Sequence, residues 1–168
     1  YFGGGMNAIV FQELREARGL AYSASAVYAS PYRLGGNESF YTYIITQNDK
    51  MMDCVTEFNK LLNNVPVRQS GFDLAKQSLM KSLASQRTTK YSILTSYLAA
   101  QRLGIDYSLS EKIYNALPSL QLQDVINFEK EYIANKPFKY IILGNEKELD
   151  IKALEKIAPI KRVTTEEI

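Results

Sequence analysis

The chain has 168 residues, of which 46% are hydrophobic and 23% are charged. This length fits one domain with a substantial core, and a net charge of +2 over mixed signs gives no reason to expect a nucleic-acid partner. The sequence contains no histidine, the commonest catalytic acid–base and a principal zinc ligand, which excludes most hydrolase designs. Cys54 alone supports neither a disulfide nor a cysteine metal site, and we expect a small buried side chain.

The first third of the sequence predicts a helix followed by two antiparallel strands. After a glycine-rich entry, Asn7 is a plausible cap for a helix that runs through Arg18 and ends at Gly19. Strand-like alternation covers residues 20–30, and a turn-rich segment separates it from a second strand over residues 39–47. No run approaches the roughly 18 apolar residues of a membrane span.

The rest of the sequence predicts a block of helices and one closing strand. The expected helices cover residues 48–63, 70–89, 91–103, 110–117, 122–134 and 148–157. The apolar run over residues 138–144 predicts a strand. This order indicates a single α+β domain over residues 1–168, with helices on one face of a mainly antiparallel sheet. Three strands are few for such a sheet, so we expect a chain that lacks its first strands and helix.

The segment from Phe11 to Tyr22 carries the candidate site. It predicts the end of an amphipathic helix, a glycine cap and the start of a strand. Arg15 and Tyr22 then lie at the helix end and the strand start, where both could reach one bound group. A guanidinium is a rigid, permanently charged donor suited to an extended peptide backbone. The alternatives are a solvated charge for Arg15 and a core residue, on one face with Leu20 and Ala24, for Tyr22.

Other features of the sequence have simpler interpretations. Glu13 and Glu16 share one side of the helix and, without histidine beside them, we expect surface charges. Gly3, Gly4 and Gly5 are not followed by the Gly-Lys-Ser/Thr of a phosphate loop, and we interpret them as a turn between two helices. The strand over residues 23–30 is either an ordinary interior strand or an edge to which an extended peptide adds.

The sequence resembles a known family in several blocks that cover nearly the whole chain in order. The blocks are Tyr1-Phe2-Gly3-Gly4-Gly5-Met6-Asn7, Val10 to Glu16, Arg18 to Ser23, Gly104 to Tyr107, Leu122 to Val125 and Tyr140 to Asn145. They closely resemble the pitrilysin-like (insulinase-type) zinc metallopeptidases. The first block is fairly specific for that family and the later blocks support it.

The resemblance implies an architecture and a set of partners. Members of the family pair two homologous α+β domains around a peptide, and one half carries an inverted His-x-x-Glu-His zinc motif. Without histidine, this chain resembles the metal-free half, of the mitochondrial-processing-peptidase-like fold. The zinc is then expected in a homologous partner half, on the same polypeptide or a separate subunit. The family domain normally has further strands and a helix before the glycine loop, and that loop can border the peptide chamber.

The resemblance also implies roles for two residues. In the family, an Arg and a Tyr spaced as Arg15 and Tyr22 are here reach the substrate, which would make Tyr22 an oxyanion donor. We therefore expect the chain to hydrolyse nothing alone and to complete a zinc-dependent endopeptidase when paired. The alternatives are a scaffolding subunit of the same fold and a stand-alone peptide-binding module.

Overall fold

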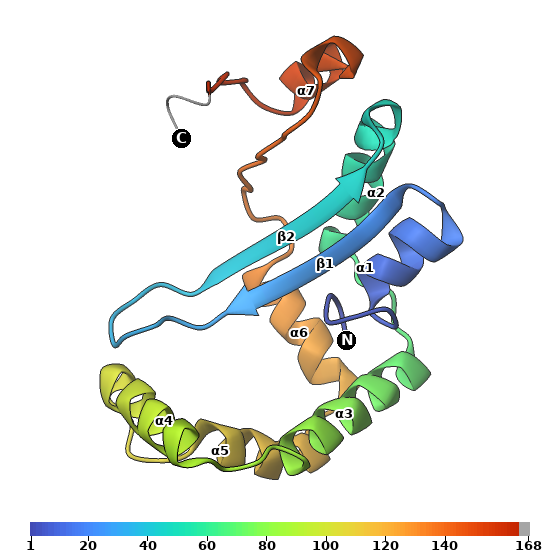
Figure 1. The fold of residues 1–168 in the computed structure, drawn as a ribbon. Coiled ribbons are helices and arrows are strands. Elements are labelled where there is room, and N and C mark those ends of the chain that lie inside the picture. Colours follow the sequence, from blue (N-terminus) through green and yellow to red (C-terminus); the bar gives the residue numbers. More distant parts are fainter. Residues whose placement is uncertain (165–168) are drawn as a thin grey trace.

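The computed structural model describes residues 1–164 and shows a β-hairpin covered by helices on one face (Figure 1). The hairpin consists of β1 (Ala21–Ala29) and β2 (Ser39–Thr46), which pair antiparallel. The α-helices are α1 (Ile9–Phe11), α2 (Met51–Asn63), α3 (Gln69–Ala84), α4 (Lys90–Leu103), α5 (Leu109–Ala116), α6 (Leu122–Tyr132) and α7 (Ile151–Ile157). A π-helix, η1 (Gln12–Ala17), follows α1, and the 3-10 turns are η2 (Asn48–Lys50), η3 (Leu117–Ser119) and η4 (Glu146–Glu148).

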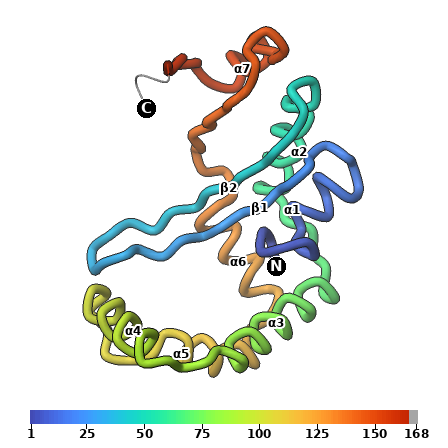
Figure 2. The backbone as a smooth tube through the Cα atoms, viewed as in Figure 1, coloured from blue at the N-terminus to red at the C-terminus, as the bar shows by residue number. Residues whose placement is uncertain are grey.

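The arrangement of these elements confirms the α+β class. In the tube view of Figure 2, α2 and α6 lie behind the hairpin, while α3, α4 and α5 continue as an arc below it. Within residues 1–164 the sheet has two strands, fewer than the three that the sequence predicts. In the same residues, no helix has the length and apolar character needed to cross a membrane.

The core forms where α1, η1 and α2 pack against the inner face of the hairpin. The core combines side chains of the first helical segment, the inward face of α2, and residues of β1, α3 and α6. Its members include Ile9, Val10, Leu14, Ala24, Cys54, Phe58, Leu62, Phe72, Leu122 and Ile126. Cys54 is buried as expected, and burial raises the pKa of its thiol. Leu14, which is 0% exposed, is the apolar residue by which η1 packs into this core.

The end of the first helical segment is built as the sequence predicts. Gly19 has a φ of +59°, its N–H donates to the Arg15 carbonyl at 2.9 Å, and Leu20 N–H donates to Leu14 O at 2.8 Å. Glycine adopts this left-handed conformation without the penalty that a Cβ adds. The predicted start is wrong, because Ala8 is the N-cap residue of α1 and Asn7 precedes it.

The predicted strand over residues 138–144 is absent among the described elements. The segment runs alongside β2, since the Phe138 ring lies 6.1 Å from the Phe40 ring at one end and Gly144 lies beside Asn48 at the other. Among the described residues, however, this segment makes no backbone–backbone hydrogen bond. An apolar run becomes a strand only when a neighbouring backbone pairs with it, so composition alone misled the prediction.

Two leucines provide a direct test of where the core lies. Leu14 is 0% exposed in η1, whereas Leu143 is 101% exposed in the unpaired segment. We predict that Leu14→Ala lowers the free energy of unfolding by about 2–5 kcal/mol, because it removes buried methyl groups and leaves a cavity. The matched control Leu143→Ala should change it by less than about 0.5 kcal/mol. Urea unfolding measures both values, and equal losses would contradict this assignment of the core.

Candidate functional site

A β-bulge at the start of β1 turns Tyr22 away from the core. The regular pairing runs from Ser23 opposite Ile45 to Ala29 opposite Ser39, and the register shifts between Ala21 and Ser23. The extra residue on a bulged strand changes which face the neighbouring side chains occupy. Tyr22 is consequently 74% exposed. The alternative that made Tyr22 a core residue beside Ala24 is therefore wrong.

The side chains of Arg15 and Tyr22 meet on this exposed face. The Arg15 guanidinium carbon lies 5.5 Å from the centre of the Tyr22 ring and 4.8 Å from that of Phe11. Both distances are in the range of cation–π attraction. Arg15 comes from η1, and π-helical turns are rare and are frequent at functional sites. The structure thus brings together the two residues that sequence spacing singled out.

Both polar groups of this pair are available to a ligand. The Tyr22 hydroxyl has no hydrogen-bond partner among residues 1–164. Arg15 makes one long ion pair, 3.7 Å from its Nε to Glu16, and its side chain remains 41% exposed. An exposed ion pair of this length contributes little to stability and is readily exchanged for another anion or carbonyl. The pair is therefore ordered by ring stacking, while its hydrogen-bond donors remain free.

Glu13 is the site's buried anchor, which corrects its assignment as a surface charge. It is 8% exposed, and its carboxylate accepts hydrogen bonds from Arg18 and from Arg68, the N-cap residue of α3. The Nε of Arg18 also lies 3.3 Å from Oε2 of Glu57. Sequence reasoning missed this role, although Glu13 falls on the apolar stripe, three residues after Val10. A charge on an apolar helical stripe indicates a buried ion pair, and only the fold supplies Arg68 as the partner.

The glycine loop is a turn against the hairpin. The Gly3 carbonyl accepts a 3.4 Å hydrogen bond from Ala26 N–H in β1, and a Cβ on Gly3 would lie 2.2 Å from the Ala26 carbonyl oxygen. Only glycine permits this close approach. Gly4 and Gly5 have open space around them. The loop thus covers part of the free edge of β1, which leaves less of that edge for an added peptide strand.

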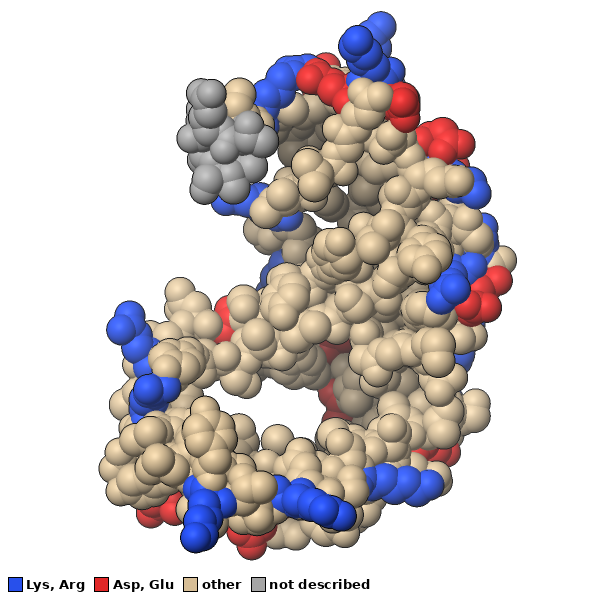
Figure 3. Space-filling view, viewed as in Figure 1, with Lys and Arg blue, Asp and Glu red and all other residues tan. Residues whose placement is uncertain are grey.

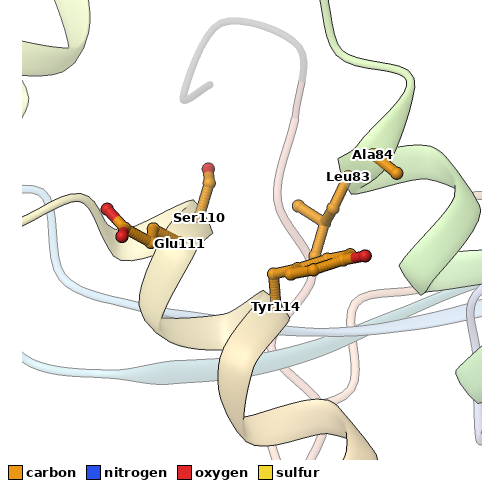
Figure 4. A pocket seen from close by; sticks show the side chains of 5 residues that line it. All are labelled: Leu83, Ala84, Ser110, Glu111 and Tyr114. Carbon is orange, nitrogen blue, oxygen red and sulfur yellow. The ribbon is translucent and has the colours of Figure 1, made fainter.

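A shallow surface depression lies away from the Arg15–Tyr22 pair. It measures about 250 Å³ and lies between the end of α3 and the start of α5 (Figure 4). In Figure 4, Leu83 and the ring of Tyr114 approach each other, whereas the polar ends of Ser110 and Glu111 point elsewhere. The Ser110 hydroxyl and the Glu111 carboxylate are therefore not arranged as a nucleophile and its base.

An apolar cavity of about 280 Å³ separates the inner face of the hairpin from α3 and α6. Its wall includes Glu129, which is 5% exposed and whose Oε1 has no hydrogen-bond partner. Burial raises the pKa of this carboxyl, because the charged form loses its hydration. Lys76 also lines the cavity but donates to the carbonyls of Pro118 and Leu120 at 2.8 and 2.9 Å. Glu129 is therefore an electrostatic cost to the fold.

The residues present do not fit a metal centre. Within residues 1–164, no group of three or more Asp, Glu, Cys or His side chains is placed to hold a metal ion. Glu13, the most deeply placed carboxylate of the candidate site, is already neutralised by two arginines.

The burial of Glu129 gives a pH-dependent prediction. A carboxyl whose pKa is raised in the folded state binds its proton more tightly there, so stability falls as pH rises above its unfolded pKa of about 4.3. We predict that the difference in unfolding free energy, wild type minus Glu129→Gln, decreases between about pH 4 and pH 8. Urea unfolding across this range measures it, and a difference that stays constant would contradict the raised pKa.

Comparison with known proteins supports the α+β fold. Residues 1–79 match the family described as the peptidase M16 inactive domain. The crystal structure of a peptidase M16 inactive domain from Pseudomonas fluorescens is similar, with a TM-score of 0.62 and 19% sequence identity. That match covers 81% of this chain and 36% of the other, so this chain spans well under half its length. No curated protein matches. The chain is thus similar to the peptidase M16 inactive domains, by sequence over residues 1–79 and by fold over most of its length.

Proposed function

We propose that this chain is the metal-free, substrate-binding half of a zinc-dependent endopeptidase. The observation that carries the proposal is the exposed Arg15–Tyr22 pair, whose guanidinium lies 5.5 Å from the phenol ring and whose hydroxyl is unpaired. An inactive M16 domain implies a partner domain in its family, and we propose that this partner carries the zinc. The chain would close the chamber around the peptide.

Arg15 would bind the peptide backbone in this proposal. Its five N–H donors lie in a rigid plane, so one guanidinium can hold a carbonyl oxygen in a defined direction. The rings of Phe11 and Tyr22 both lie within cation–π distance of it, which limits the rotamers it samples. A donor that is already oriented loses less entropy when the peptide binds.

Tyr22 would act on the reacting peptide bond. Negative charge develops on the carbonyl oxygen of that bond as a nucleophile attacks it, and a fixed O–H donor stabilises the charge when it appears. The bulge directs Tyr22 out of the sheet, and the Thr46 hydroxyl holds the adjoining backbone by donating to Leu20 O at 2.6 Å. Because the donor is supplied in place, it does not have to reorganise during the reaction.

A scaffolding subunit that kept the fold is the alternative function. It would need the Glu13 ion pairs and the core but not the free hydroxyl of Tyr22 or the exposed guanidinium of Arg15. The unused hydrogen-bond donors of this exposed pair would have no function in a scaffolding subunit. The specific exposure of this pair favours the substrate-binding half.

The Tyr22→Phe substitution tests the proposal in the assembled peptidase, formed with its zinc-bearing half. Removing one oxyanion donor should lower kcat by about 10²–10³-fold with little change in KM, because the hydroxyl acts mainly in the transition state. The control is Tyr91→Phe in α4, which removes another exposed hydroxyl far along the chain from the site. Peptide hydrolysis over a range of substrate concentrations gives kcat and KM for both variants, and an unchanged kcat for Tyr22→Phe would refute the oxyanion role.

A further inference from the structure

We propose that the helix-free face of the hairpin extends the site and binds apolar and aromatic side chains of an extended peptide, several residues from the bond that is cut. This outer face is defined by exposed side chains of both strands: Tyr22, Val27, Tyr41, Tyr43 and Ile45. The inference rests on the proposed function and assigns a substrate class to the same site.

The pairing of the strands aligns the outer face in rows. Val27 lies opposite Tyr41, Ser25 opposite Tyr43, and Ser23 opposite Ile45. Successive outward residues of a strand are two positions apart, so Tyr41, Tyr43 and Ile45 form a row about 14 Å long. Such a row has the spacing at which an extended peptide presents alternate side chains.

The two strands contribute side chains of different size to the outer face. The β2 row carries two tyrosines and an isoleucine, whereas Ser23 and Ser25 of β1 have small side chains. Peptide side chains placed over the serines would therefore contact the flanks of the β2 row. Tyrosine provides a large contact area with few rotatable bonds, and its hydroxyl can also form a hydrogen bond.

The charge distribution selects the kind of peptide. Neither strand contains Lys, Arg, Asp or Glu. In Figure 3 the hairpin lies in front of its helices, and its surface is almost free of charged residues, which gather around the edge of the molecule. A face without charge offers no partner to a charged peptide side chain, which would lose hydration on binding. Apolar and aromatic side chains carry no such penalty.

The outer face is continuous with the Arg15–Tyr22 pair. Tyr22 belongs to both, because the bulge places Tyr22 and Ser23 next to Ile45 at the end of β1 that Arg15 approaches. A peptide held by Arg15 could thus continue along the row toward Tyr41. This continuity between the row and the Arg15–Tyr22 pair favours an extended peptide over a second copy of the chain.

The chain has no tryptophan, so a single Trp in a peptide reports binding without background. The probes are an eight-residue peptide with Leu, Val and Phe around the Trp, and a matched peptide with Lys and Glu in their places. Titration of Trp emission with the 168-residue chain gives each Kd. The variant is Tyr43→Ser, and the control is Tyr91→Ser, since Tyr91 is also exposed but lies on α4. Circular dichroism checks that both variants are folded.

We expect Tyr43→Ser to raise the Kd of the apolar peptide about five- to tenfold and Tyr91→Ser to leave it unchanged, as for loss of one aromatic contact. The charged peptide should bind at least about tenfold more weakly. Equal effects of the two variants or equal affinity for the two peptides would overturn the inference. Self-association of the unmodified chain that Tyr43→Ser abolishes, measured by analytical ultracentrifugation, would also overturn it.

The same variant separates this inference from the proposed function. In the assembled peptidase, Tyr43→Ser should raise KM for apolar peptides and leave kcat intact, whereas Tyr22→Phe should lower kcat. If Tyr22→Phe leaves kcat unchanged but Tyr43→Ser raises KM, the oxyanion role is wrong and the peptide-binding face stands. If Tyr43→Ser leaves KM unchanged but Tyr22→Phe lowers kcat, the peptide-binding face is wrong and the oxyanion role stands.

Discussion

The buried carboxylate of Glu13 is the interaction on which the site depends. It joins η1 to Arg18 at the helix end and to Arg68 at the start of α3, so one charge connects segments that are 55 residues apart in sequence. A carboxylate this deeply buried is stable only because its hydrogen bonds and two cations replace the lost water. With η1 held in this way and packed on the core through Leu14, Arg15 is directed to the outer face.

The local parts of this arrangement follow from the sequence. The apolar stripe of Val10 and Leu14, the left-handed Gly19 and the strand that follows were all predicted, because each depends on neighbours within a few residues. The spacing of Arg15 and Tyr22 was informative for the same reason. When a helix ends at a glycine and a strand follows directly, residues just before and just after that glycine stay close together in space.

The predictions that the structure contradicts concern features that depend on contacts between distant segments. The bulge that exposes Tyr22 is a property of the pairing with β2, and the burial of Glu13 needs Arg68. The segment over residues 138–144 looks like a strand from its composition, but strand formation requires a paired backbone, which periodicity does not report. Alternation along β1 was likewise interrupted by a single extra residue, which moved Tyr22 from the predicted core face to the outer face.

The proposed function can be tested by a structure of this chain bound to its proposed zinc-bearing half and an uncleaved peptide. We expect a peptide carbonyl oxygen within hydrogen-bond distance of both the Tyr22 hydroxyl and the Arg15 guanidinium, about 2.7–3.2 Å from each donor. We also expect the bound backbone to continue over the outer face toward Tyr41 and Tyr43. A peptide bound elsewhere, with Arg15 and Tyr22 making no contact with it, would contradict the proposed function.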